Sequence, residues 1–184
     1  MHTATIDEVT FELVVGDITE QDDLAAVVNA ANAELAPGSG VAGAIHRAAG
    51  AELYRVCQPL APIEVGEAVI TSGFDLPNEH IIHVLGPRHG LDEPAAELLA
   101  DCYREALALA DEEGLPSVGF PAVSTGAFGY PLAEAADIAM HTVLDALSGL
   151  AHLRLVRFVL VDADALKVHV EALTAATGDP DEPA

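Results

Sequence analysis

The chain has 184 residues and carries 30 Asp and Glu against 7 Lys and Arg, so its formal net charge is −23 at pH 7. So few cations cannot form the concentrated basic surface that binding to nucleic acid or to an anionic membrane requires, and we expect neither partner. With 51% hydrophobic residues, this length predicts one compact, soluble domain that buries about 70% of the surface of its unfolded chain.

Short apolar runs alternate with longer runs whose apolar residues recur at helical spacing. In chain order these patterns predict a strand at residues 11–15, a strand at 25–30, a helix at 41–53, strands at 67–73 and 80–86, a helix at 94–113, a strand at 117–123, a helix at 131–147, a strand at 153–161 and a helix at 164–175. Gly50 is expected to weaken or end the first of these helices, and Pro131 suits the first residue of the third. Residues 1–176 then form a single domain, and the acidic tail, residues 177–184, is expected to be disordered.

This alternation of strands and helices is typical of an α/β fold in which helices cover both faces of a largely parallel central sheet. Ligands of such folds bind at the carboxyl ends of the strands. The loops that follow strands are therefore the places where functional residues are expected.

Three such loops stand out, at residues 16–19, 29–43 and 124–131. The second and third combine small residues with the start of a helix, where free backbone N–H groups and the helix dipole favour an anion. Together they could cradle a phosphate without Lys or Arg, although glycine-rich sequence is also the ordinary composition of a tight turn. Neither loop is a known nucleotide fingerprint, since GxxxxGK[ST] is absent and the glycines at 38, 40 and 43 follow a different strand-to-loop length from that of a dinucleotide fold.

Single residues in these loops are open to two interpretations. Asp17 follows a strand, where a carboxylate either caps the next turn or contacts a ligand. Asn32 ends a buried strand, where an amide often ties a loop together. Ser124 could be a nucleophile, but no GxSxG elbow occurs and no partner can be named for it. Three histidines are expected to be packed, hydrogen-bonded side chains and not ligands: His46, His83 and His141.

Five motifs make the set recognisable. They are GDIT at 16–19, VVNAAN at 27–32, GVAGAIHRAAG at 40–50, HIIHVLGP at 80–87 and FPAVSTGAFGYP at 120–131. In this order and spacing they resemble the macrodomain family, especially its bacterial O-acetyl-ADP-ribose deacetylase branch, over about residues 10–175. The resemblance implies a three-layer α/β/α sandwich with a mixed sheet and a pocket for ADP-ribose.

The resemblance also implies roles for individual residues. Asp17 would hold the adenine amino group, and the Ile18 backbone would reach the ring. Asn32 would grip the distal ribose and help to position water, which makes it the candidate catalytic residue. The diphosphate and distal ribose would lie between two sets of residues, Gly40, Val41 and Ala42 on one side and Ser124, Thr125, Gly126, Ala127 and Phe128 on the other. No metal or redox cofactor is implied.

Two positions depart from the family pattern. The hydrolytic bacterial branch typically reads GGGGVDGAIH, and this chain has Ala42 where that pattern has Asp, so a carboxylate that could orient or activate water is missing. Some viral members resemble this chain in having GVAGA and are still hydrolases, using the Asn and the ligand's own phosphate to place water. Val161 stands where the branch often has an aromatic residue near adenine, which predicts binding weaker by about 1 kcal/mol or more.

Two classes of function follow. The leading hypothesis is an enzyme that hydrolyses an ester at the distal ribose, either in O-acetyl-ADP-ribose or in proteins mono-ADP-ribosylated on Asp or Glu. The alternative is a non-catalytic reader of ADP-ribose or of ADP-ribosylated proteins, which Ala42 favours. A serine hydrolase acting through Ser124 is a third possibility, and a monomer is expected in each case.

The remaining features concern the cellular setting. Cys57 and Cys102 are far apart and belong to no Cys/His cluster, so neither a disulfide framework nor a zinc site is expected. Acidic residues occupy the N-terminal segment where a signal peptide needs a basic and then an apolar run, which predicts a cytoplasmic protein. A single Lys with dispersed acids resembles salt-adapted proteins, so the source has high internal salt or the protein is merely acidic.

Overall fold

The computed structural model describes residues 1–178. Within them the elements follow the order β1 (His2–Ile6), β2 (Val9–Val15), the 3-10 helix η1 (Ile18–Glu20), β3 (Ala26–Ala30), α1 (Gly40–Ala49), α2 (Ala51–Cys57), β4 (Ala68–Ser72), β5 (His80–Val84), α3 (Ala95–Glu112), β6 (Ser117–Phe120), α4 (Leu132–Leu147), β7 (Leu155–Leu160) and α5 (Ala163–Thr177). The strands form one sheet in the order β1-β2-β7-β6-β3-β5-β4.

The sheet is mixed and largely parallel, as predicted. The four inner pairs, from β2–β7 to β3–β5, are parallel, whereas β1 pairs antiparallel with β2 at one edge and β4 pairs antiparallel with β5 at the other. The inner strands are short apolar runs, buried on both faces, which is why they are readable as strands in the sequence.

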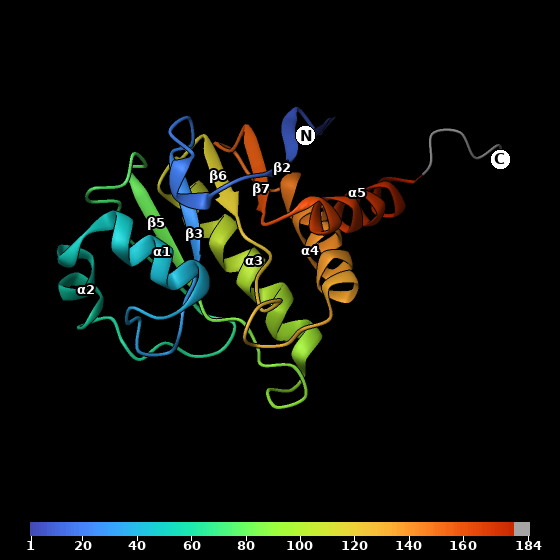
Figure 1. The fold of residues 1–184 in the computed structure, drawn as a ribbon. Helices are drawn as coiled ribbons and strands as arrows, with labels where there is room; N and C mark the ends of the chain where they lie inside the picture. The colour runs from blue at the N-terminus through green and yellow to red at the C-terminus, as the bar shows by residue number, and fades with distance from the viewer. Residues whose placement is uncertain (179–184) are drawn as a thin grey trace.

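Helices cover both faces of the sheet and complete three layers (Figure 1). Helices α3, α4 and α5 pack against one another on one face, over a core that contains Tyr103, Phe120 and Phe158. Helices α1 and α2 cover part of the other face, over a second core that contains Val27, Ile45 and Ile81. The predicted three-layer α/β/α sandwich is therefore confirmed.

The structure corrects several details of the prediction. The edge strand β1 was not predicted, because its residues alternate between half-buried and exposed and half of its pattern is polar. Pro131 does not begin α4: its ψ of 127° is extended, so it occupies the cap position and the helix starts one residue later. The strand expected at residues 117–123 ends at Phe120, before Pro121, which has no N–H for the sheet.

Helix ends also differ slightly from the prediction. Gly50 ends α1 with a φ of 84°, and a second short helix follows it directly, in agreement with the role expected of this glycine. Helix α5 continues to Thr177, so the expected tail begins later than residue 177, and the prediction of disorder for the rest of the tail falls on residues 179–184, outside the described residues.

The uncharged stretch 115–133 forms β6, a loop and the start of α4. No helix in the described part of the chain is long and apolar enough to span a bilayer. The loop in this stretch lies at the carboxyl edge of the sheet, together with the loops that follow β2, β3, β5 and β7. This edge is where the candidate site forms.

Candidate ligand-binding site

A cleft runs along the carboxyl edge of the sheet and consists of two lobes that share Gly40, Val41, Ala122 and Gly126 as walls. The first lobe has a volume of about 290 Å³ and is lined by the loops after β3, β5 and β6. The second has a volume of about 620 Å³ and is lined by the loops after β2, β6 and β7. We call them the neutral lobe and the acidic lobe, after the residues described below.

Within the described residues 1–178, no ionisable side chain lines the neutral lobe. Its lining residues are Ala30, Ala31, Asn32, Gly38, Ser39, Gly40, Val41, Ala42, Gly86, Ala122, Val123, Ser124, Gly126, Ala127 and Phe128. In a chain with a net charge of −23, a cavity free of carboxylates is a local exception that removes short-range repulsion of an anion.

The start of helix α1 forms one wall of the neutral lobe. Ser39 occupies its cap position, but the Ser39 side chain makes no capping hydrogen bond within the described structure. The first N–H groups of a helix have no partner inside the helix, and the dipole places partial positive charge at this end. Gly40 enters the helix with a φ of 58°, a conformation that favours glycine. The wall can therefore donate hydrogen bonds to an anion from main-chain groups alone.

The loop after β6 forms the opposite wall and is tightly folded. The Thr125 hydroxyl donates to the Ala122 carbonyl at 2.8 Å, and the Tyr130 N–H donates to the Ser124 carbonyl at 3.0 Å. From the loop after β5, the His89 N–H donates to the Phe128 carbonyl at 2.9 Å. These bonds fix the shape of the wall before any ligand arrives, which lowers the entropic cost of binding.

Ser124 occupies the base of this loop. Its φ of 66° lies in the left-handed region, and its Oγ is buried without a hydrogen-bond partner in the described structure. A Cβ on Gly86 would meet this oxygen, which explains why a glycine is needed there. Because the hydroxyl is buried and no base contacts it, the site gives no support to Ser124 as a nucleophile.

Asn32 lies at the end of the neutral lobe. Its amide nitrogen donates to the Ala36 carbonyl at 2.8 Å, and its amide oxygen accepts from the Ala36 N–H at 3.0 Å. A side-chain amide has two donor hydrogens and two acceptor lone pairs, so one of each remains available to a ligand. Residue 42 faces the same lobe and contributes only a methyl group.

The acidic lobe contains three carboxylates, those of Asp17, Asp162 and Asp164. Asp162 accepts a hydrogen bond from the Ala165 N–H at 2.8 Å and caps α5. Val161 lies at the rim and is 80% exposed, so nothing in the described structure covers that side of the lobe. Neither Asp162 nor Asp164 was predicted, because a carboxylate at a helix start has an ordinary capping role.

Asp17 has one of the two roles that the sequence left open, that of a cap, and it also lines the acidic lobe. Its Oδ1 accepts hydrogen bonds from the Thr19 N–H at 2.8 Å and from the Thr19 hydroxyl at 2.7 Å, so the carboxylate caps η1. These two bonds, the backbone one first, lower the pKa of Asp17 from its usual value and keep it ionised. Because both bonds are made to Oδ1, Oδ2 remains available to the lobe.

The structure brings the predicted site residues together in one cleft. Asn32, Ala42, Ser124, Ala127 and Phe128 line the neutral lobe; Asp17, Ile18 and Thr125 line the acidic lobe; Gly40, Val41 and Gly126 line both. Sequence reasoning did not assign Gly86, Ser39 or the two aspartates after β7 to the site, because each type of residue has an ordinary structural role, in a turn or at the start of a helix.

The histidines lie outside the cleft. His83 is fully buried; its Nδ1 lies 3.0 Å from Nδ2 of Asn29, and its Nε2 lies 2.9 Å from Oγ1 of Thr71. Burial, with a smaller effect of nearby His46, lowers the pKa of His83 to about 3. It is packed and bonded, as expected. His46 is buried as expected, but neither of its ring nitrogens has a hydrogen-bond partner in the described structure. His141 is exposed on α4 and therefore not packed, but its Nδ1 lies 2.9 Å from the Asp137 carbonyl oxygen, so the expectation was wrong in part for these two.

Comparisons with known proteins agree with this arrangement. The Macro domain model matches residues 28–139. The O-acetyl-ADP-ribose deacetylase of Salmonella typhimurium is 42% identical over 174 residues, which cover 92% of this chain and 97% of that protein. A macro domain-containing protein of Chlorobaculum tepidum is 44% identical over 170 residues, covering 92% and 98% of the two chains.

Solved structures are similar over most of their length. The Oceanobacillus iheyensis macrodomain with ADP superimposes with a TM-score of 0.91 at 41% identity and covers 96% of each chain. The Trypanosoma brucei macrodomain in complex with ADP-ribose gives a TM-score of 0.82 at 37% identity, covering 89% of this chain and 68% of that one.

Proposed function

This chain belongs to the macrodomain family, and we propose that it binds ADP-ribose across the two lobes and hydrolyses esters at the distal ribose. The ester is an O-acetyl group on free ADP-ribose or the side chain of a mono-ADP-ribosylated Asp or Glu in a protein. The observation that carries the proposal is the neutral lobe, a charge-free cavity between a helix N-terminus and a preformed loop in a strongly acidic protein.

The diphosphate is assigned to the neutral lobe near its boundary with the acidic one. There it can accept hydrogen bonds from main-chain N–H groups at the start of α1 and in the 126–128 segment, without any Lys or Arg. The base then lies in the acidic lobe, where Oδ2 of Asp17 can accept from the adenine amino group and the Ile18 backbone can reach the ring. The distal ribose lies beside Asn32.

The proposed reaction is a hydrolysis that depends on positioning. The free donor and acceptor of the Asn32 amide hold the ribose hydroxyls, and a water placed beside a phosphate oxygen attacks the ester carbonyl. The bond from the acyl carbon to the ribose oxygen breaks, that oxygen takes a proton, and the products are ADP-ribose and a carboxylic acid. Such positioning can supply about 7–11 kcal/mol of the barrier reduction. No metal or redox cofactor takes part.

Single-turnover release of ADP-ribose from a glutamate-modified protein, run in molar KCl, tests this proposal. We expect release by the wild type and a loss of about 100-fold or more in Asn32→Ala, the size of effect seen when one oriented polar group of an active site is removed. Because Asn32 also bonds Ala36, circular dichroism must show that the variant is folded. An unchanged rate in the folded variant would contradict the role given to Asn32.

One observation favours a second function, that of a non-catalytic reader. The methyl group of Ala42 stands in the neutral lobe where the hydrolytic branch has a carboxylate. Folded wild-type protein that binds ADP-ribose but releases none from either O-acetyl-ADP-ribose or a glutamate-modified protein would establish the reader function.

A further inference from the structure

The segment between β2 and β3, residues 16–25, crosses the face of the sheet that α1 and α2 only partly cover. Ile18 and Leu24 bury their side chains in the second core. Leu24 lies directly over Gly119 of β6: a Cβ at Gly119 would be 2.6 Å from Leu24 Cδ1. The segment thus packs onto the sheet where a larger side chain at position 119 would exclude it.

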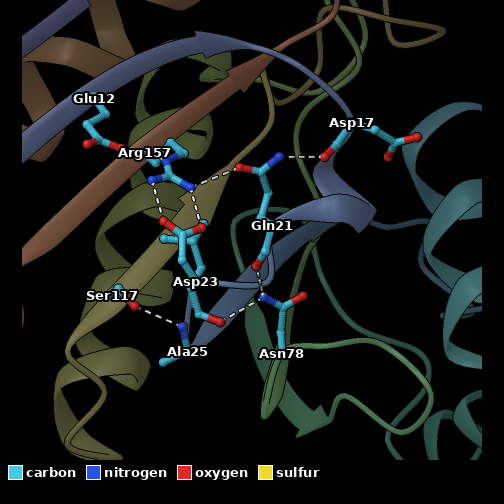
Figure 2. Close-up of polar contacts among 9 residues, drawn as sticks. Glu12, Asp17, Gln21, Asp23, Ala25, Asn78, Ser117 and Arg157 are labelled. Carbon is cyan, nitrogen blue, oxygen red and sulfur yellow. Dashed lines mark hydrogen bonds and ion pairs between the residues drawn. The ribbon is translucent and has the colours of Figure 1, made fainter. Parts of the chain in front are cut away.

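Arg157 of β7 binds this segment through its guanidinium group (Figure 2). Its side chain is 13% exposed, and it donates to Glu12 of the neighbouring strand and, through both terminal nitrogens at 2.7 Å, to Asp23 of the segment. The bonds to Asp23 are the main cause of a raised pKa for Arg157, and they lower the pKa of Asp23. Both shifts favour the charged forms of the two groups, which stabilises the ion pair.

Gln21 joins Arg157 to the acidic lobe. Nη1 of Arg157 donates to the Gln21 side-chain oxygen at 3.0 Å, and the side-chain nitrogen of Gln21 donates to the Asp17 carbonyl at 2.7 Å (Figure 2). The main chain of Gln21 is fixed as well, because Asn78 donates to its carbonyl at 2.7 Å. An amide side chain is the group that can accept from a guanidinium and donate to a carbonyl at once.

Asp17 is consequently held at both ends. Thr19 binds one oxygen of its carboxylate, and Gln21 binds its main-chain carbonyl. Asp17 lines the acidic lobe, and its Oδ2 takes part in none of these bonds. The direction of the carboxylate depends on both sets of bonds. Hydrogen bonds select between ligands only when their donors and acceptors are fixed to within a few tenths of an ångström.

We propose that Gln21, fixed by Arg157, is a positioning residue for base selection: it aims the Asp17 carboxylate at the exocyclic amino group of a 6-aminopurine. The inference rests on the proposed function, since it takes the base to lie in the acidic lobe. The proposed function assigns contact with the base to Asp17. The inference adds two residues that set the direction of the Asp17 carboxylate, Gln21 and Arg157, which are 136 positions apart in the chain.

The test is the ratio of affinities, measured by calorimetry, for ADP-ribose and for its hypoxanthine analogue, in which a keto group replaces the amino group. In the wild type ADP-ribose binds more tightly. Gln21→Met, of similar length but without donor or acceptor, lowers the preference by about tenfold, the worth of one oriented hydrogen bond. Gln21→Glu keeps an acceptor for Arg157 but loses the donor to Asp17, and it lowers the preference in the same way.

Two control variants distinguish a positioning role of Gln21 from a general destabilisation of the 16–25 segment. Ser117→Ala removes the hydroxyl that accepts from the Ala25 N–H at 2.8 Å, at the far end of the same segment, and must leave the preference intact while lowering the melting temperature. In a background of Asp17→Asn, which itself removes the preference, Gln21→Met must have no further effect on the ratio, because residues that act through one another are not additive.

The possible failures are distinguishable. If the wild type does not bind ADP-ribose, or binds both ligands equally, the proposed function or its placement of the base is wrong. If the wild type prefers ADP-ribose and folded Gln21→Met keeps the full preference, or Ser117→Ala loses it equally, the proposed function stands and the positioning role of Gln21 is overturned.

Discussion

The two lobes of the cleft differ in charge although they share a wall. In the part of the chain that the structure describes, no ionisable residue lines the neutral lobe, whereas three aspartates line the acidic lobe. In a protein of net charge −23, carboxylates are the default at a surface, so their exclusion from one lobe is the informative feature. The difference shows how an acidic protein can bind an anion: the site has no carboxylate in its lining, and main-chain N–H groups donate the hydrogen bonds.

Under the proposed function, the same difference in charge orients the ligand. A diphosphate placed in the acidic lobe would face two or three carboxylates, each costing about 1–4 kcal/mol at contact distance, depending on exposure to water. In the proposed orientation the diphosphate lies in the neutral lobe, where main-chain N–H groups can bind it. The base then lies in the acidic lobe, where a carboxylate can accept from its amino group. The charge pattern therefore selects one direction of binding.

Placing a carboxylate in the neutral lobe should have the largest effect. Ala127 is exposed and lines this lobe, so Ala127→Asp adds charge there without disturbing a core. We expect the affinity for ADP-ribose to fall by about 30-fold, from repulsion of about 2 kcal/mol. Calorimetry gives the dissociation constant.

The matched control is Ala44→Asp, which adds the same group to the acidic lobe. There we expect a loss of about threefold or less, because the diphosphate is further away and water screens the charge. Equal losses in the two variants would contradict the division of the cleft into lobes.

Restoring a carboxylate at position 42 separates binding from catalysis within the neutral lobe. Ala42→Asp should speed single-turnover ester hydrolysis by about tenfold or more, since a positioned base can orient the attacking water. Ala42→Asn has a similar size without the charge and should give no such gain. If the carboxylate changes only the affinity, the attacking water does not lie near residue 42.

An aromatic ring at the rim of the acidic lobe should raise the affinity for ADP-ribose. Val161 is 80% exposed beside this lobe, and Val161→Phe offers a face on which adenine can stack. We expect ADP-ribose to bind about fivefold more tightly, for a stacking contribution of about 1 kcal/mol. Ribose 5-phosphate, which has no base, should bind unchanged; a gain for both ligands would place the base elsewhere.

Salt concentration should have the smallest effect on the affinity for ADP-ribose. The sign of this effect distinguishes a site without cationic side chains from one built on Lys and Arg. Sites built from Lys and Arg lose affinity as salt rises. Here KCl screens the repulsion from the remaining charge of the molecule, so the affinity for ADP-ribose should rise about twofold from dilute to molar KCl. Melting curves in the same buffers test the salt adaptation suggested by the composition, and a melting temperature independent of KCl would contradict it.

Much of the fold could be predicted from the sequence, because the buried strands are uninterrupted apolar runs and the long helices have one apolar face. The edge strand β1 could not, since it pairs through its backbone and needs few apolar side chains. The two glycine-rich walls were predicted because small residues before a helix have a direct physical meaning. Of the two roles predicted for Asp17, the cap is confirmed and the ligand contact stays a prediction.

The support behind the site could not be read in the sequence. Arg157 and Gln21 meet only because β7 lies beside β2 and because the 16–25 segment folds back over the sheet. Their contact joins residues 136 positions apart, and nothing local marks either one. Likewise, the absence of charge from the neutral lobe emerges only when loops from three strands come together.

The most direct test of this account is an NMR titration of ¹⁵N-labelled protein with two halves of the ligand. Ribose 5-phosphate should shift the amide signals of Ser39, Ala42, Ala127 and Phe128, which line only the neutral lobe, whereas adenosine should shift those of Asp17 and Ile18. ADP-ribose should shift both groups. If adenosine shifts the neutral-lobe amides and ribose 5-phosphate shifts the acidic-lobe ones, the ligand binds in the opposite direction and the account is contradicted.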